Sequence, residues 1–190
     1  MIKAQLKNDT KVITGKVRLS YANIFTPRAA SEGAEPKFSV SLIIPKDDTE
    51  QVKLIEKAIA NATERDKGKW SGKVPPNLKT PLRDGDLDRP DDENYINSYF
   101  LNANSSSAPQ VVGLEKDPVT GKPIPLGENE VYSGCYARVS VNFYGYNSNG
   151  NKGIGCGLGN IQKVADGARL GGGSTAEEDF EFEDAEDDFI

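Results

Sequence analysis

The alternation of apolar and polar residues along the chain is clearest in the stretch 131–164. In its first half, every second residue from Cys135 to Phe143 is small or apolar. The residues between and after them are mostly polar or aromatic: Tyr136, Arg138, Ser140, Asn142, Tyr144 and Tyr146. A period of two is that of a β-strand with one buried face. This half therefore predicts a strand whose outer face carries tyrosines and one arginine.

The second half of the stretch is predicted to pair with the first as a hairpin. Ile154, Cys156 and Leu158 form its core face. The Asn149-Gly150 pair favours a tight turn because both residues tolerate positive φ. The positions that alternate with the core face are all glycine: Gly153, Gly155, Gly157 and Gly159. Two interpretations of this bare outer face stay open, since a neighbouring tyrosine can fold over the glycines or a flat base can stack there.

Shorter alternating runs predict further strands at residues 11–21, 37–45 and 95–102, with another short one at 110–114. The expected inward residues are Ile13, Val17, Leu19 and Tyr21 in the first run, Phe38, Val40, Leu42 and Ile44 in the second, and Ile96 and Phe100 in the third. The expected outward residues include Thr14, Lys16 and Arg18 in the first run, Lys37 in the second, and Tyr95 and Tyr99 in the third. Residues 75–125 otherwise indicate long loops, because eight of the eleven prolines lie there.

One convincing amphipathic helix is predicted in the segment that starts at Asp47. Val52, Ile55, Ile59 and Ala62 recur at helical spacing and form a single apolar stripe. Acidic residues in the first turn suit the helix dipole. Such a stripe most simply closes one end of a barrel, so the pattern as a whole predicts a small, mainly β barrel with one helix.

The loop after this helix places an aromatic residue among basic ones. The sequence Lys-Gly-Lys-Trp-Ser-Gly-Lys at 67–73 surrounds Trp70, the single tryptophan, with Lys69, Lys73 and a third lysine. An exposed basic loop of this kind can stack a base on the ring while its lysines neutralise phosphates. The alternative interpretation is that Trp70 anchors the loop to the body of the protein.

Charge divides the chain into two parts. Residues 174–190 hold nine of the 29 acidic residues and none of the 23 basic ones, although the chain as a whole has a net charge of −6. The body, residues 1–173, therefore carries 23 basic against 20 acidic side chains. A mildly basic body with an acidic tail suggests a protein that meets polyanions. We expect a folded domain over residues 1–170, followed by a flexible glycine joint and a disordered acidic tail over 171–190.

Composition narrows the class of protein further. Cys135 and Cys156 fall on predicted core faces and are too few for a disulfide framework, so a reducing compartment is expected. No apolar run approaches the roughly 20 residues needed to cross a membrane, and the start lacks a secretory core. Histidine, the usual general base and commonest metal ligand, is absent. We therefore expect a soluble, non-enzymatic protein without a cofactor or a metal.

An acidic triplet invites one competing interpretation. Asp84, Asp86 and Asp88 alternate as in a calcium loop, but the EF-hand pattern requires Gly at its sixth position and Glu at its twelfth. Arg89 and Tyr95 stand at those positions. A solvated turn is the expected structure, and a metal-dependent nuclease that uses these three carboxylates ranks third among the functional hypotheses.

Two motifs carry a resemblance to a known family. They are Pro-Leu-Arg-Asp-Gly-Asp at 81–86 and Gly-Leu-Gly-Asn-Ile-Gln-Lys-Val-Ala-Asp-Gly at 157–167, the latter followed by Leu-Gly-Gly-Gly at 170–173. With them the chain resembles phage single-stranded DNA-binding proteins, specifically the domain-of-unknown-function group DUF2815 that includes the Enc34-type proteins. The resemblance covers nearly the whole length. It implies an OB-fold, which is a small Greek-key β-barrel, and a role in coating single strands during phage DNA replication or recombination in the cytoplasm of the infected bacterial host.

The acidic tail more loosely resembles those of T7-type and bacterial single-stranded DNA-binding proteins, which recruit replication enzymes and end in Phe. This chain departs from that pattern because Ile190 follows Phe189. The resemblance implies that the tail contacts phage replication proteins and competes with DNA. The expected partner-binding residues are Phe180, Phe182, Asp187, Asp188, Phe189 and Ile190.

The first hypothesis for the function is a binder of single-stranded DNA without strong sequence preference. Expected phosphate contacts come from Lys16, Arg18, Lys37, Lys69, Lys73 and Arg138, and expected base stacking from Trp70, Tyr99, Tyr144 and Tyr146. Duplex DNA or RNA is expected to bind more weakly, and the oligomeric state is open. The second hypothesis, from a different class, is a protein-interaction module whose acidic tail mimics nucleic acid and occupies a host protein.

Overall fold

The computed structural model describes residues 2–171 of the chain. The expected partner-binding residues of the tail, from Phe180 to Ile190, lie outside the described residues. None of the helices within residues 2–171 has the length and apolar character needed to cross a membrane.

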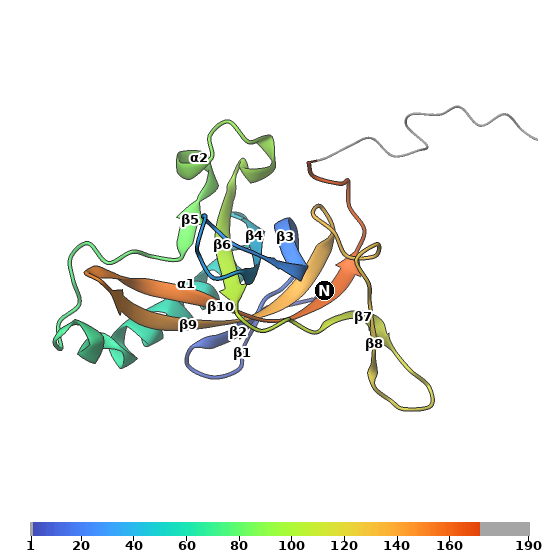
Figure 1. Cartoon of the computed structure of the whole chain (residues 1–190), viewed down its shortest axis with the longest axis horizontal. Coiled ribbons are helices and arrows are strands. Elements are labelled where there is room, and N and C mark those ends of the chain that lie inside the picture. The colour runs from blue at the N-terminus through green and yellow to red at the C-terminus, as the bar shows by residue number, and fades with distance from the viewer. Residues whose placement is uncertain (1, 172–190) are drawn as a thin grey trace, which may run out of the picture.

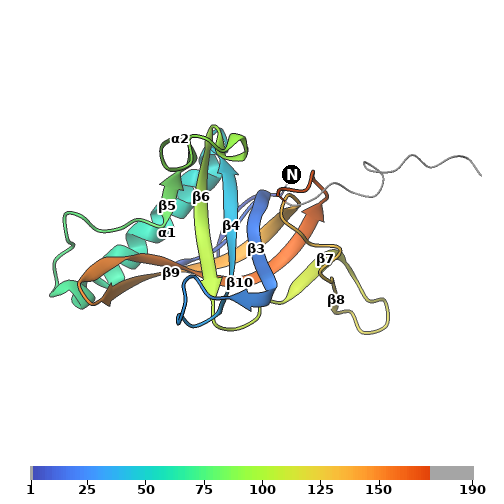
Figure 2. The same cartoon turned by 45° about the horizontal axis from the view of Figure 1, so that its top comes forward.

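Five strands form a closed barrel (Figures 1 and 2). They are β3 (Val17–Arg28), β4 (Lys37–Pro45), β6 (Ser98–Ser105), β9 (Tyr136–Ser148) and β10 (Asn151–Ala165). Around the barrel the order is β9, β3, β4, β6 and β10, and β10 pairs again with β9. The pairing of β6 with β10 is parallel, whereas the other four pairings are antiparallel. A small Greek-key barrel of five strands is the architecture of the OB-fold, so the expected mainly β fold class is confirmed.

Shorter elements extend this barrel. The hairpin of β1 (Gln5–Leu6) and β2 (Lys11–Ile13) lies beside β9, and the hairpin of β7 (Val111–Lys116) and β8 (Pro123–Pro125) lies beside β10. Strand β5 (Leu82–Asp84) pairs with β6 and leads into the short helix α2 (Gly85–Asp88). Two 3-10 turns, η1 (Lys67–Trp70) and η2 (Glu93–Tyr95), complete the elements. The expected loop region, residues 75–125, therefore also contains β5, α2 and β8.

The long β9–β10 hairpin has the predicted faces. The alternate residues of β9 are buried in the barrel, and so are those of β10: Ala137, Val139, Val141, Phe143, Ile154, Cys156 and Leu158. At the turn, Asn149 and Gly150 have φ values of 51° and 83°, as the Asn-Gly signal requires. Cys135 and Cys156 are both buried and free, which confirms that they are core residues.

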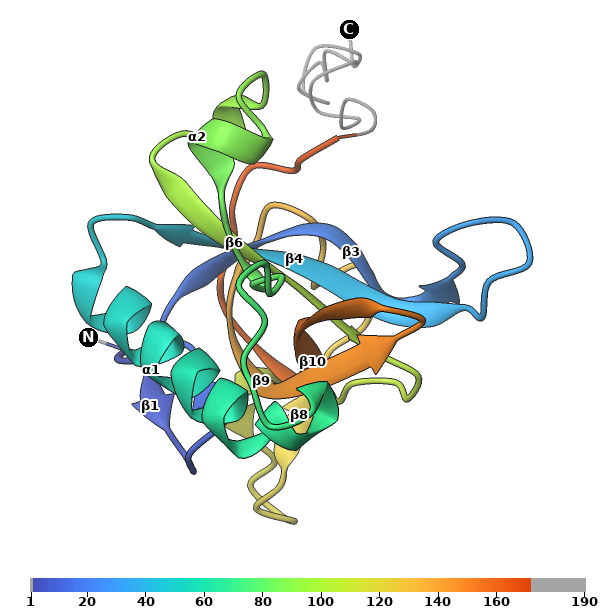
Figure 3. The same ribbon diagram turned by 90° about the vertical axis from the view of Figure 1, so that its left-hand side faces the viewer.

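Helix α1 (Thr49–Arg65) is the predicted amphipathic helix. It lies against β9 and the β1–β2 hairpin (Figure 3). Asp48 caps its start, because the Asp48 carboxylate accepts a hydrogen bond from the backbone N–H of Gln51. Val52, Ile55 and Ala62 are buried as expected. The helix thus packs on the core of the barrel and contacts both strands of the β9–β10 hairpin.

The first predicted strand is wrong in continuity and partly in its faces. Residues 14–16 separate β2 from β3, because side chains replace the strand's own hydrogen bonds there: Gln51 Oε1 accepts from Gly15 N–H at 2.7 Å, and Thr14 Oγ1 accepts from Val139 N–H at 2.9 Å. Thr14, expected outside, is therefore fully buried. Across this break the pattern shifts by one residue, so Val12 rather than Ile13 is buried.

The third predicted strand begins three residues later than expected, at Ser98. Its barrel face carries Leu101 and Ala103. Phe100, expected in the barrel core, packs instead on the outer side with Ile43 and Tyr95. The chain from α2 to η2, residues 85–95, covers this side of β4 and β6, and we call it the α2 segment. Both faces of the sheet are therefore apolar near Phe100, and a period of two does not show which face points into the barrel. Tyr95, expected outside, is consequently fully buried, and Ile96, expected inside, is 55% exposed.

Candidate nucleic-acid interface

The outer face of β4 and β6 carries a cleft with a polar floor. Ser39 on β4 lies opposite Asn104 on β6, with Asn23 of β3 beside Ser39 and Gly157 of β10 beside Asn104. We call this hollow the polar cleft. It has a volume of about 720 Å³ and is lined by Asn23, Arg28, Ala29, Ala30, Ala34, Glu35, Lys37, Ser39 and Asn104. Figure 2 shows β3, β4 and β6 side by side on the near face, with the β3–β4 loop at their lower end.

The floor of the polar cleft follows from alternation along two strands. Val40 and Ala103 point into the barrel, so Ser39 and Asn104 next to them point outward. These side chains are short, so a ligand can approach the sheet closely, and their hydroxyl and amide groups can donate and accept hydrogen bonds. In OB-folds the face of the second and third strands and the loops beside it bind oligonucleotides. The polar cleft occupies that position here.

A tyrosine of β9 lies across β10 from the cleft, on the outer side of the same sheet. Tyr144 lies opposite Gly155, and a Cβ atom on Gly155 would stand 2.6 Å from the ring carbon that bears the hydroxyl. Tyr146 lies in the same way over Gly153, where an added Cβ atom would stand 2.7 Å from the Tyr146 hydroxyl. The glycines therefore leave room for tyrosine rings, as the first interpretation of the glycine face predicts. Both rings are only half-buried, so they also keep accessible surface.

Tyr144 presents an uncharged aromatic ring at neutral pH. Burial raises the pKa of its hydroxyl further above the neutral range. Only strand β10 lies between Tyr144 on β9 and Asn104 on β6, and its residue beside Asn104 is Gly157, which has no side chain. The ring and the cleft floor therefore belong to one surface. An uncharged aromatic ring beside hydrogen-bonding side chains is a suitable platform for a base.

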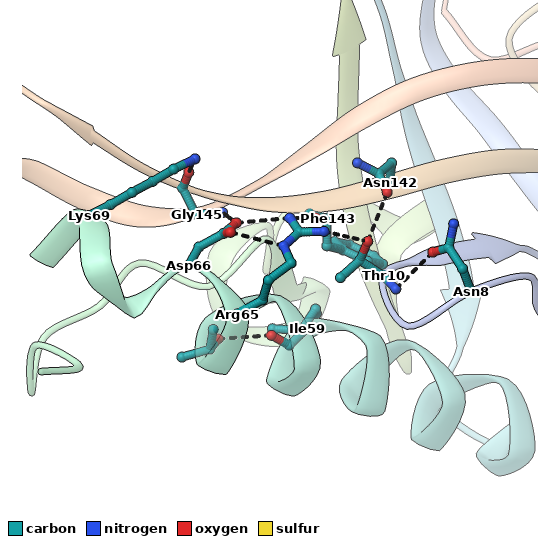
Figure 4. Close-up of polar contacts among 10 residues, drawn as sticks. Asn8, Thr10, Ile59, Arg65, Asp66, Lys69, Asn142, Phe143 and Gly145 are labelled. Carbon is teal, nitrogen blue, oxygen red and sulfur yellow. Dashed lines mark hydrogen bonds and ion pairs between the residues drawn. The ribbon is translucent and has the colours of Figure 1, made fainter. Parts of the chain in front are cut away.

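Charged groups at the end of α1 hold the hairpin segment that carries Tyr144 (Figure 4). The Asp66 carboxylate accepts hydrogen bonds from Gly145 N–H at 2.7 Å and from the Arg65 guanidinium at 2.9 Å. Arg65 also donates to Thr10 Oγ1 and to the carbonyl of Phe143. We call these contacts the Asp66 clamp. The hydrogen bond from Arg65, helped by that from Gly145, lowers the pKa of Asp66 to about 2, so the clamp is charged at neutral pH.

Trp70 belongs to the same support and is not an exposed stacking residue. Its side chain is 4% exposed, and its indole N–H donates to the carbonyl of Tyr146 at 2.9 Å. The ring lies over Gly145, where a Cβ atom would stand 2.9 Å from it. Its burial and this hydrogen bond favour the anchoring interpretation of Trp70 over the expected stacking role. Because Gly145 has no side chain, the Trp70 ring can pack directly against the backbone there.

The expected phosphate-binding arginines are already engaged with the backbone. Arg18 donates to the carbonyls of Gly134 and Ala168, at 3.1 and 2.8 Å. Arg138 donates to the carbonyls of Thr14 and Lys3, at 3.3 and 3.4 Å. Each guanidinium thus ties separate segments together, which is a structural role.

The expected site residues fall into several surfaces instead of one. Lys16 and Arg18 line a small hollow with Tyr136, whose ring lies 4.5 Å from Lys16 Nζ. Arg138 lines another groove, with Lys7 and Lys11, on the faces of β2, β9 and β10. Around a closed barrel, outward residues of one strand point in different directions, and a linear pattern does not reveal this. Neither of these two surfaces includes the cleft floor.

The remaining expected residues lie as follows. Lys37 lines the polar cleft at the start of β4. Lys69 and Lys73 are exposed beside the hairpin, and Lys69 donates to the carbonyl of Gly145 at 2.7 Å. Tyr99, expected on the outer face, packs partly against the barrel core instead. Of the ten expected residues, therefore, Lys37 borders the polar cleft directly and Tyr144 lies one strand away.

Sequence reasoning missed several residues of this face. Asn104 is one, because the expected strand ended at Asn102, although the Asn-Ala-Asn alternation at 102–104 signals one more outward position. Arg28 is another, since β3 runs on to Arg28 whereas the predicted strand ended at residue 21. Tyr21, expected in the core, is 57% exposed and lies against Arg89. No pattern in the sequence brings Tyr21 and Arg89 together.

The acidic triplet is neutralised by neighbouring lysine and arginine side chains. Lys46 Nζ lies 2.8 Å from a carboxylate oxygen of Asp84 and 2.8 Å from one of Asp86, while Arg83 pairs with Asp88 at 2.7 Å. The hydrogen bonds to Asp84 and Asp86 raise the pKa of Lys46. Within residues 2–171, no three acidic, cysteine or histidine side chains are gathered as metal ligands would be. The nuclease hypothesis therefore gains no support from this geometry.

Comparisons with known proteins agree with the mainly β fold. A protein-family model described as the ssDNA-binding protein of Enterobacter phage Enc34 matches residues 10–190. Protein p50 of Acyrthosiphon pisum secondary endosymbiont phage 1 is 30% identical over 181 residues, which cover 90% of this chain and 92% of p50.

Two solved structures resemble the chain as well. The single-stranded DNA-binding protein from bacteriophage Enc34, in complex with ssDNA, gives a TM-score of 0.76 at 25% identity and covers 90% of this chain and 95% of its own. The single-stranded DNA-binding protein gp2.5 encoded by bacteriophage T7 gives a TM-score of 0.51 at 16% identity, covering 83% and 93%. The second likeness concerns the fold alone.

Proposed function

This chain belongs to the family of single-stranded DNA-binding proteins represented by that of Enterobacter phage Enc34, and we propose that it binds single-stranded DNA in the polar cleft. The observation that carries the proposal is the row of short polar side chains, Ser39 and Asn104 at its centre, between Tyr144 and the basic residues Arg28 and Lys37. Family membership favours this function over that of a protein-interaction module. Because the members of the family are binding proteins, no residue is assigned a catalytic role.

The proposed binding mode divides the work between two kinds of side chain. Lys37 and Arg28 attract phosphates, which supplies affinity that depends on salt and not on sequence. Tyr144 stacks on a base, and stacking tolerates every sequence because each base has a π face. Ser39 and Asn104 form hydrogen bonds with the bases or sugars over the floor. A duplex hides its base faces, so we expect it to bind more weakly than a single strand.

In the cytoplasm of the infected bacterium, the protein would coat exposed single strands during phage DNA replication or recombination. The tail supports a second part of the proposal. Its nine acidic residues are interspersed with Phe180, Phe182 and Phe189. Carboxylates can imitate phosphates and aromatic rings can imitate bases, so we propose that the tail competes with DNA and contacts replication proteins.

A titration with fluorescent oligo-dT tests both the function and the site. Lys37→Ala and Arg28→Ala should each weaken binding and lower the slope of log affinity against log salt by roughly 0.7 per lost phosphate contact. The matched control is Lys57→Ala, because Lys57 is exposed on α1, and α1 contributes no residue to the lining of the cleft. A chain that binds oligo-dT no better than duplex DNA contradicts the function. If Lys11→Ala weakens binding while Lys37→Ala does not, the strand lies in the Arg138 groove and the proposed site is wrong.

A further inference from the structure

Tyr21 has an unusual combination of backbone and side-chain environment. Its φ is +46°, in the left-handed region, which costs a residue with a large side chain roughly 1 kcal/mol or more. Its ring is 57% exposed although it is a large aromatic group. Such an arrangement persists only where the surroundings impose it.

The surroundings of Tyr21 impose this conformation from both sides. The register of β3 against β4 shifts between Ser20 and Asn23, which places Tyr21 in a bulge. The amide N–H of Ala22 donates to Ser133 Oγ at 3.0 Å, and the Asn23 side chain donates to the Tyr21 carbonyl at 3.2 Å. Bulges next to functional sites commonly redirect one side chain. Here the bulge turns the Tyr21 ring out of the barrel wall.

Arg89 holds the ring that the bulge exposes. Its guanidinium carbon lies 4.9 Å from the centre of the Tyr21 ring, 5.0 Å from that of Tyr95 and 5.5 Å from that of Phe100. One guanidinium nitrogen also lies 3.4 Å from the Tyr21 hydroxyl. Within residues 2–171, Arg89 forms no ion pair with a carboxylate. Its charge is therefore available to the aromatic groups and to a ligand beside them.

The position of Tyr21 relates it to the polar cleft. Asn23, two residues further along β3, lines the cleft, and Ser20, the preceding residue, pairs with Ser41 of β4. Crossing the sheet from Tyr144 on β9 to Tyr21 on β3 passes β10, β6 and β4. Four strand spacings of about 4.8 Å make roughly 20 Å along the curved surface. That length accommodates several nucleotides, within the usual range for one OB-fold.

We infer that Tyr21 is a second base-stacking residue, at the end of the cleft opposite Tyr144, and that Arg89 is the residue that positions its ring. The inference rests on the proposed function and names further residues of the same site. Arg89 contacts the ring from the side of the α2 segment, so the exposed surface of the ring remains for a base.

Three substitutions at Tyr21 separate binding from folding. Tyr21→Ala should weaken oligo-dT affinity roughly 5- to 150-fold without changing the salt slope, because stacking is lost and no charge is removed. Tyr21→Phe should keep most of the affinity. Tyr21→Gly is the decisive variant: it should lose as much affinity as Tyr21→Ala while its melting temperature stays equal or rises, because glycine accepts φ of +46° without strain.

The role of Arg89 is tested by a double-mutant cycle. Arg89→Met keeps the length of the side chain and removes its charge and planar group, so it should weaken binding. The double variant Tyr21→Ala/Arg89→Met should bind little worse than Tyr21→Ala alone if Arg89 acts mainly through the ring. Fully additive losses contradict the positioning role. If Tyr21→Gly binds like the unmodified chain while Tyr144→Ala binds more weakly, the inference is wrong and the proposed function stands; if the unmodified chain does not bind oligo-dT, the proposed function itself fails.

Discussion

At the scale of single residues, Asp66 makes the attachment of α1 to the hairpin depend on pH. Its pKa in the folded protein is about 2, below the roughly 3.9 of an unfolded aspartate. A depressed pKa contributes stability above the unfolded value, and this contribution is lost as pH falls from about 4 through about 2. Because Arg65 is half exposed to solvent, we expect on the order of 2 kcal/mol at most. Urea unfolding from pH 7 to pH 2 should therefore show a steeper loss for the unmodified protein than for Asp66→Asn. Parallel curves for the two proteins would contradict this prediction.

Trp70 should matter for stability and not for DNA contact. Trp70→Ala removes a 4% exposed ring and the hydrogen bond to Tyr146, so we expect a loss of about 3–5 kcal/mol in the free energy of unfolding. Trp70→Phe keeps part of the volume and should lose less. The measurement is circular dichroism during urea unfolding, together with oligo-dT affinity under conditions where each variant is folded. A folded Trp70→Phe variant with clearly weakened DNA binding would restore the stacking role.

At the scale of elements, the β9–β10 hairpin contains a matched pair of glycines that tests its packing. A Cβ atom at Gly155 would lie 2.6 Å from the Tyr144 ring, whereas at Gly157 its nearest neighbour would be the Asn142 carbonyl at 3.4 Å. Gly155→Ala should therefore cost roughly 1–3 kcal/mol of stability or displace the ring, and Gly157→Ala should be close to neutral. Thermal unfolding of both variants checks this difference. Adding Tyr144→Ala to Gly155→Ala should recover much of the loss, and a double variant as unstable as expected from additivity would refute the contact.

The elements also differ in how far the sequence predicts them. The β9–β10 hairpin and α1 are predictable because each has one apolar face and one polar face, and β4 is predictable because only Ile43 interrupts the same alternation. Strand β6 is not, because its outer face is covered by the α2 segment and both faces are apolar near Phe100. The same limit applies to the candidate site. Lys37 and Tyr144 follow from strand alternation, whereas Tyr21 and Arg89, 68 residues apart in the chain, meet only through tertiary structure.

At the scale of the whole molecule, the charge separation between body and tail predicts a salt-dependent effect. Removing everything after Gly173 leaves 23 basic and 20 acidic residues, so the formal charge changes from −6 to +3. A tethered acidic segment has an effective concentration on the order of millimolar. If it competes with DNA, the shortened chain should bind oligo-dT more tightly at low salt, and the gain should shrink as salt screens the attraction.

Affinity of both forms across a salt series tests the competition, and pull-down of phage replication proteins tests the partner role. Equal affinity at every salt concentration, with partners retained, would reduce the tail to a solubilising appendage. Loss of partners without a change in affinity would support recruitment and contradict the competition with DNA.

The pairing of strands far apart in the chain also governs how the protein is made. Val12 of β2 pairs with Val141 of β9, and Asn104 of β6 pairs with Gly157 of β10. During synthesis, the strands that emerge first therefore wait for the last two before the barrel can close. Until then the inner apolar faces of β3, β4 and β6 are open to solvent and to other nascent chains. For such non-local pairing we expect refolding from denaturant in the range of milliseconds to seconds.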